Sequence, residues 1–169
     1  YILQKFAGYV SLLISLPDNY FAGVAYKRNL TDEQFGTIST DTSAHPNDTL
    51  VLKMIKVQSL IPQNLLAWEM KLKNIYKLPA TNISESGFEF DVKYLSGGIY
   101  SSNLPGITEN LITILGLDKP TGIPGTSDGK FDFNPGITID TENGWIIFPS
   151  IKPFLDKMES YNNNGQTID

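Results

Sequence analysis

The chain has 169 residues, 41% of them hydrophobic and 11% aromatic, which suffices for one domain with a hydrophobic core and argues against disorder. Its net charge of −5, without a Lys/Arg stripe to neutralise phosphates, argues against nucleic acid as a partner. With no cysteine, the chain lacks the residue needed for thiol catalysis, disulfides, thiolate zinc sites and iron–sulfur clusters.

The first predicted elements are strands. The chain begins at Tyr1 and not at Met, so we expect it to be a segment of a longer protein. YVSLLISLP (9–17) and YFAGVAYKRN (20–29) predict a hairpin joined through residues 17–19. FGTIST (35–40) predicts a short strand, and TLVLKMIKVQSL (49–60) a longer one with less regular alternation.

The clearest alternation with a period of two comes next. In GFEFDVKY (87–94), apolar and aromatic residues alternate with charged ones, which predicts a half-buried strand with one face in water. LLAWEMKLKNIY (65–76) repeats the pattern and predicts a similar strand. No run of about 18 apolar residues occurs, so the sequence predicts no transmembrane helix.

Two segments predict short helices instead. GITENLITILGLD (106–118) has Thr108 as its expected N-cap and Gly116 placed to end the helix. SIKPFLDKMESY (150–161) has a serine before a first turn that contains Pro153. We therefore predict a mainly β protein, a β-sandwich or jelly-roll-like domain with one or two short helices. We expect residues 1–160 to form a single β-rich domain and residues 161–169 a frayed tail or linker.

Residues 125–154 are the stretch richest in turn dipeptides and aromatic residues. Their pattern allows either a metal site or a series of tight turns. Calcium binds several oxygen ligands from a flexible loop with a glycine at its sharp turn. The candidate ligands here are Asp128, Asp132 and Asn134, with Asp118 upstream. A calcium loop places acidic or amide residues at alternate positions before the glycine, and this stretch does not. We expect no cofactor, with calcium kept as the alternative.

Turn chemistry explains the same residues better. Asp128-Gly129 is a turn dipeptide, Asn134-Pro135-Gly136 forces a second turn, and Asn143-Gly144 is a strong hairpin signal. Residues 137–148 then predict two strands that fold back on each other, with Trp145 among the inward side chains. The interpretation that follows is a scaffold of turns that present core aromatic residues.

Nothing in the sequence predicts catalysis. The single histidine, His45, lies in a loop-like segment before a proline, and no nucleophile elbow, phosphate loop or dinucleotide motif occurs. Aromatic side chains could instead bind sugar or a partner. The sugar candidates are Tyr20, Phe21, Tyr26, Tyr76, Tyr94 and Tyr100, and the binding candidates with most weight are Trp68, Tyr76 and Trp145.

Two blocks of sequence carry a family resemblance. LLAWEMKLKNIYKLPA (65–80) resembles the Trp-x-Met-x-x-Lys-Asn-x-Tyr-x-Leu signature of the SprA/Sov family. DGKFDFNPGITIDTENGWIIFPSIKPF (128–154) resembles that family's Asp-Gly-x-Phe-Asp-Phe, Pro-Gly-x-Thr-Ile, Asn-Gly, Ile-Ile-Phe-Pro and Pro-Phe series. LITILGLDKP (111–120) is similar to the Leu-Asp element that precedes this series. LSGGIYSSNLPGITEN (95–110) is shorter and less charged than in the family, so no partner contact through it is implied.

The resemblance implies a function. Such proteins are very large outer-membrane translocons of type IX secretion, linked to gliding motility, and this segment would be one soluble, noncatalytic module of such a protein. It implies a place in the bacterial cell envelope, at the outer membrane, on the cell surface or on its periplasmic side. Its expected partners are other parts of the same protein and secretion-system components. The alternative is an independent carbohydrate- or calcium-binding cell-surface module.

Overall fold

A computed structural model describes residues 1–4, 8–38, 49–58, 61–120 and 124–162. Mutual contacts divide the chain into two compact units. Unit 1 comprises residues 1–13 and 72–169, and unit 2 comprises residues 14–71. Whether they fold together as the single domain expected over residues 1–160 stays a prediction.

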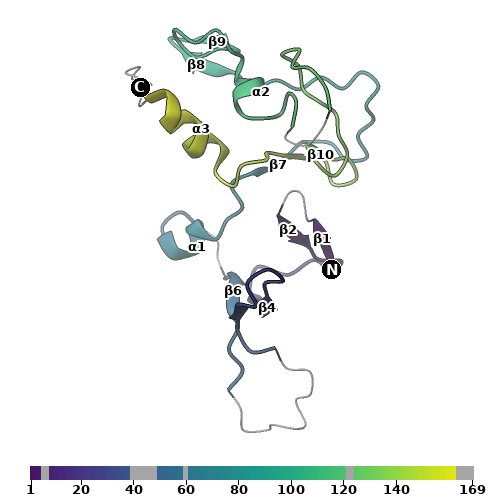
Figure 1. The fold of residues 1–169 in the computed structure, drawn as a ribbon, viewed down its shortest axis with the longest axis vertical. Helices are drawn as coiled ribbons and strands as arrows, with labels where there is room; N and C mark the ends of the chain where they lie inside the picture. The colour runs from purple at the N-terminus through teal and green to yellow at the C-terminus, as the bar shows by residue number, and fades with distance from the viewer. Residues whose placement is uncertain (5–7, 39–48, 59–60, 121–123, 163–169) are drawn as a thin grey trace. The chain divides into compact units, whose positions relative to one another are not determined.

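Unit 1 contains short strands and two helices (Figure 1). Its strands pair as β1 with β2, β8 with β9, and β10 with β11 and β7 in the order β10-β11-β7. The strands are β1 (Ile2–Gln4), β2 (Tyr9–Ser11), β7 (Ile75–Lys77), β8 (Tyr94–Ser96), β9 (Ile99–Ser101), β10 (Ile139–Asp140) and β11 (Trp145–Ile147). The helices are α2 (Leu111–Ile114) and α3 (Pro153–Asn162).

The three-stranded sheet joins segments that are far apart in the sequence. β10 and β11 form the predicted hairpin around Asn143-Gly144, with Ile139 opposite Ile146. β7 then pairs antiparallel with the other edge of β11, with Ile146 opposite Tyr76. Main-chain hydrogen bonds continue the contact beyond β7, because Leu78 N donates to Gly144 O and Ile83 N to Thr141 O. The strong Asn-Gly signal is thus confirmed as a hairpin.

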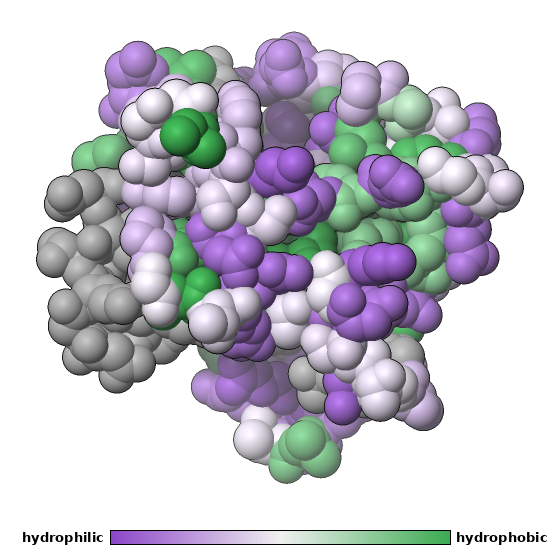
Figure 2. All heavy atoms as spheres, turned by 90° about the horizontal axis from the view of Figure 1, so that it is seen from above, coloured by the Kyte–Doolittle hydropathy of each residue, from purple (hydrophilic) through white to green (hydrophobic). Residues whose placement is uncertain are grey.

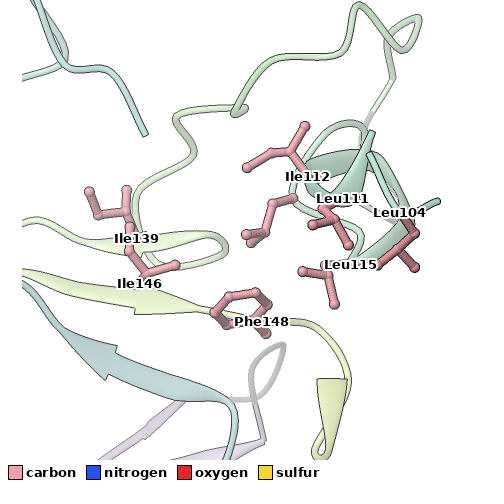
Figure 3. Close-up of a cluster of buried hydrophobic side chains, with 8 residues drawn as sticks. Leu104, Leu111, Ile112, Leu115, Ile139, Ile146 and Phe148 are labelled. Carbon is pink, nitrogen blue, oxygen red and sulfur yellow. The ribbon is translucent and has the colours of Figure 1, made fainter. Parts of the chain in front are cut away.

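A buried apolar cluster lies between this hairpin and α2. Figure 3 shows side chains from β10 and β11 on one side and from α2 on the other pointing toward a common interior. Burial of such side chains is the main favourable contribution to folding. The cluster consists of Leu104, Leu111, Ile112, Leu115, Leu117, Ile139, Ile146 and Phe148.

Residues 87–94 keep the predicted alternation but not the predicted strand. Phe88, Phe90 and Val92 are half-buried and pack against the core cluster, while the residues between them are exposed. Only the end of this segment lies in a strand, because β8 begins at Tyr94. The segment is held by side-chain packing and not by a ladder, since the Phe88 ring contacts the rings of Phe131 and Phe133 edge-on.

Both predicted helices of unit 1 are present. Helix α2 is shorter than expected, and its N-cap is Asn110, not Thr108. Gly116 follows the helix with φ 76°, as predicted for a helix-ending glycine. Helix α3 begins at Pro153, and the Ser150 hydroxyl makes a hydrogen bond with the Asp156 carboxylate in its first turn. Of the expected tail, residues 161–162 belong to α3 and residues 163–169 lie outside the described residues.

Unit 2 pairs its strands differently from the prediction. The expected hairpin between residues 9–17 and 20–29 does not form, because β2 pairs with β1 and the later segment pairs with strands further along the chain. One sheet joins β3 to β6 and the other joins β4 to β5. The elements of unit 2 are β3 (Ala22–Val24), β4 (Tyr26–Lys27), β5 (Gln34–Phe35), β6 (Lys53–Lys56) and α1 (Leu65–Glu69).

The prediction of a strand over residues 65–76 was wrong in its first half. Residues 65–69 form helix α1, and only residues 75–77 form a strand, β7. The reason is an N-cap that alternation alone does not reveal, since the Asn64 side chain accepts a hydrogen bond from Ala67 N at 3.3 Å. Asn64 thus starts a short helix within an apparent strand pattern.

The mainly β class is confirmed by the structure. The described strands form one three-stranded and four two-stranded sheets, so the two large packed sheets of a sandwich or jelly roll are not found among them. Short strands separated by turns and by extended, unpaired segments explain this difference. Among the described residues, no helix has the length and apolar character to cross a membrane.

The β10–β11 turn generates a stability prediction. Gly144 has φ 68°, and a Cβ built on it would lie 1.7 Å from Ala80 O, so the chain that passes the turn leaves no room for a side chain. We expect Gly144→Ala to lower the free energy of unfolding by more than about 3 kcal/mol, from backbone strain and steric overlap together. Urea unfolding, followed by tryptophan fluorescence, measures this change.

Gly136→Ala is the matched control. Gly136 has φ 78° in another turn of unit 1, but a Cβ at this position would have no atom within 4 Å. Only the backbone strain remains, and we expect a loss of about 1 to 2 kcal/mol. Equal effects of the two substitutions would contradict the close approach of residues 78–83 to the Gly144 turn.

Candidate functional site

The buried carboxylate of Asp118 is the centre of the most connected polar cluster in unit 1. Its side chain is only 3% exposed. Oδ2 accepts hydrogen bonds from Thr113 Oγ1 at 2.6 Å, from Ser127 Oγ at 2.5 Å and from Gly129 N at 2.9 Å. Oδ1 accepts a further hydrogen bond from Asp128 N at 3.2 Å. The carboxylate therefore holds the loop at residues 127–129 against α2.

Local sequence explains why Asp118 points into the protein. Gly116 takes the positive φ that ends α2, and the chain then turns so that Leu117 N and Asp118 N both donate to Ile112 O. The neighbouring Leu117 is fully buried in the core cluster. A short helix that ends at a glycine thus places one apolar and one acidic side chain in the interior.

Hydrogen bonding sets the charge state of this carboxyl. Burial is the largest influence and by itself raises the pKa of Asp118. The hydrogen bonds from Ser127, Thr113 and the main chain of Gly129 and Asp128 favour the ionised form and together lower the pKa of Asp118 below its ordinary value. The group is therefore a carboxylate at neutral pH, with its lone pairs used by protein donors.

The three candidate calcium ligands are placed differently. Asp128 is exposed, and its Oδ1 accepts from Lys130 N at 3.0 Å, which is a local turn contact. Asp132 Oδ2 accepts from Lys119 N at 2.7 Å. Asn134 uses its main chain in the following turn, where its carbonyl accepts from Ile137 N and Thr138 N. Within the described ranges, no group of three or more acidic or histidine side chains converges in a way that could hold a metal ion.

The three aromatic binding candidates belong to both units, Trp68 to unit 2 and the other two to unit 1. Trp68 belongs to unit 2, where Lys71 Nζ lies 4.3 Å from its ring centroid. Tyr76 and Trp145 lie on neighbouring strands, but Trp145 is opposite Lys77 and Tyr76 is opposite Ile146, so their side chains leave opposite faces of the sheet. The Tyr76 ring contacts Phe148 and Phe154 edge-on. Tyr76 is thus part of the packing around the start of α3.

A cleft of about 600 Å³ lies beside the core of unit 1. Its walls come from residues 88–91, residues 129–131, Ser102 and Asn110. Three half-buried phenylalanine rings lie next to acidic, amide and basic side chains there. Figure 2 shows the same mixture on one face of the molecule, where hydrophobic residues reach the surface between hydrophilic ones. Sequence reasoning missed this cleft, because it assumed a paired strand over residues 87–94.

A second hollow, of about 460 Å³, separates the β1–β2 hairpin from the β10–β11 turn. Tyr9 is buried at its edge. Burial raises the pKa of the Tyr9 hydroxyl, and the charge of Asp140 adds to the rise. Asp140 itself accepts hydrogen bonds from Asn143 N and Nδ2, so its carboxylate serves the hairpin turn. Glu142 is the other acidic residue that lines this hollow.

Sequence reasoning named Asp118 only as an upstream calcium ligand. The signal for its actual role was an acidic residue two positions after a helix-ending glycine, followed by a Ser-Asp-Gly turn that supplies donors. His45 lies outside the described residues, so its environment stays untested. No protein-family model matches the chain, and no curated protein is significantly similar to it.

Replacement of Asp118 is the sharpest test of this cluster. At neutral pH, we expect Asp118→Asn to lower the free energy of unfolding by about 3 kcal/mol, because charged hydrogen bonds are lost and buried donors stay unpaired. The matched control, Asp128→Asn, removes an exposed charge, and we expect a loss below about 1 kcal/mol. Equal losses for the two variants in urea unfolding would contradict the role of Asp118.

The same carboxylate predicts a pH dependence. Its pKa is lower in the folded than in the unfolded protein, so its stabilisation is present above the unfolded value of about 3.9 and is lost as pH falls through the lowered folded value. We expect the difference in unfolding free energy between wild type and Asp118→Asn to shrink across that acidic range. A constant difference from neutral pH to below that range would show that ionisation of Asp118 does not matter.

The arrangement of carboxylates also predicts the response to calcium. Because both Asp118 oxygens and one oxygen each of Asp128 and Asp132 accept protein hydrogen bonds, we expect the same melting temperature with calcium and with chelator. A site filled at about 100 times its Kd would add roughly 2.7 kcal/mol of stability. A rise of several degrees in calcium, lost in Asp128→Ala, would establish a metal site in this loop.

Proposed function

We propose that the chain is a noncatalytic structural and partner-docking module of a large outer-membrane secretion protein of the SprA/Sov kind. In this role it belongs to the bacterial cell envelope and to a machine for type IX secretion and gliding motility. Its partners are other parts of the same protein and components of the secretion system. The module contributes a folded surface and no chemistry of its own.

The observation that carries the proposal is the pairing of the two sequence blocks that resemble the family. Strand β7 comes from residues 65–80 and strand β11 from residues 128–154, and the two strands lie side by side in one antiparallel sheet. Phe148 from the second block accepts and donates hydrogen bonds with buried Asn74 from the first. Residues of the two resembling blocks are thus joined by strand pairing and hydrogen bonds, as expected if the shared sequence pattern serves the fold.

A second observation favours a docking role over an independent module. In unit 2, Ala67 is the only described hydrophobic residue that is fully buried. The neighbouring helix positions Leu65 and Leu66 are 72% and 75% exposed, and each described hydrophobic residue from 50 to 55 is more than 40% exposed. Exposed apolar side chains in such number are typical of surfaces that other protein covers.

Fractionation of the bacterium that encodes the chain tests the proposal. An antibody against the recombinant chain is used on outer-membrane, inner-membrane and soluble fractions after denaturing electrophoresis. We expect the signal on a polypeptide far larger than 169 residues, in the outer-membrane fraction. A signal only on a polypeptide of about this length in the soluble fraction would contradict the proposal.

A further inference from the structure

We propose that the cleft beside residues 88–91 binds an extended peptide segment of a partner protein, which adds to these residues as a β-strand. The inference rests on the proposed docking role and adds a site and a class of partner. Addition of a strand to a free edge is a common way in which proteins bind extended peptides.

Residues 89–91 have main-chain groups without a partner among the described residues. The N–H and C=O groups of Glu89, Phe90 and Asp91 form no hydrogen bond with any described residue. Half-buried and exposed side chains alternate along this segment, as they do along an extended chain. An extended segment with unpaired donors and acceptors is a template for another strand.

Aromatic packing and a side-chain hydrogen bond hold this segment in place. The Phe90 and Phe131 rings meet edge-on with centroids 5.3 Å apart, and Phe88 meets Phe131 at 5.6 Å. Asp91 is fixed as well, because its Oδ2 accepts from Ser102 Oγ at 2.8 Å. The segment is therefore anchored through side chains, while its main chain stays available. A preformed template lowers the entropy lost on binding.

Charged side chains that line the cleft indicate the chemistry of the occupant. The cleft has acidic side chains in Glu89 and Asp91 and one basic side chain in Lys130, and only Asp91 has an ion-pair partner, Lys93, among the described residues. Glu89 is exposed and has no ion-pair partner among the described residues, so it favours a basic peptide residue beside it. The phenylalanine rings pack against one another, so they leave no broad exposed platform of the kind that sugar binding requires.

The test uses three synthetic eight-residue peptides that alternate valine with lysine, valine with threonine, and tyrosine with lysine. Binding to the full chain is followed by NMR and by amide hydrogen exchange. We expect saturable binding of at least the lysine-containing peptides and slower exchange of amides among residues 89–91. N-methylation of the central peptide residues keeps the side chains but removes the donors, and we expect it to weaken binding at least about tenfold.

Charge variants give a matched comparison. We expect Glu89→Lys to weaken the lysine-containing peptides about two- to fivefold, as for an exposed ion pair. Glu85→Lys makes the same change at an exposed residue that does not line the cleft, and we expect no effect on binding. Cellohexaose serves as the sugar probe.

Three results would overturn the peptide site. These are failure of the two lysine-containing peptides to bind, binding without slower exchange at residues 89–91, and binding of cellohexaose with shifts of the phenylalanine ring protons. Each leaves the fractionation result unchanged, so a failed peptide site is distinguishable from a failed docking role. A chain found only as a small soluble protein would remove the docking role even if a peptide binds.

Discussion

The interaction on which unit 1 depends is the set of hydrogen bonds to the Asp118 carboxylate. Four donors from α2 and from residues 127–129 converge on one buried side chain. Because the loop is fixed there, the residues that follow it, Phe131 and Phe133, are directed onto the core cluster. A buried charge is costly unless it is paired or hydrogen-bonded, so the carboxylate and its donors stabilise the fold only as a complete set.

The sheet formed by β7, β10 and β11 depends on a second constraint, the space at Gly144. The chain after β7 passes so close to this turn that a side chain cannot be accommodated. The close approach lets residues 78–83 donate main-chain hydrogen bonds to the turn. Turn chemistry, main-chain pairing and core packing therefore support one another in unit 1. Among its described residues, unit 2 has only two-stranded sheets, and Ala67 is its one fully buried hydrophobic residue.

Features set by neighbouring residues could be predicted from the sequence. Features that depend on contacts between distant residues could not. The Asn143-Gly144 hairpin, the helix end at Gly116 and the alternating burial of residues 87–94 follow from backbone and side-chain preferences. Alternation did not reveal which strand pairs with which, or that residues 87–93 pack without strand pairing. The helix at residues 65–69 depended on one capping side chain. The role of Asp118 depended on donors that only the folded chain brings together.

Hydrogen exchange of the Asp128 and Gly129 amides is the most direct test of the loop at residues 127–129. It distinguishes a loop held by protein hydrogen bonds from a loop held by a metal ion. Both amides donate to Asp118 in the structure, so their protection requires only the folded protein. We predict that both amides exchange slowly in the presence of a chelator and that calcium leaves their rates unchanged. Fast exchange in chelator that becomes slow only in calcium would contradict the scaffold.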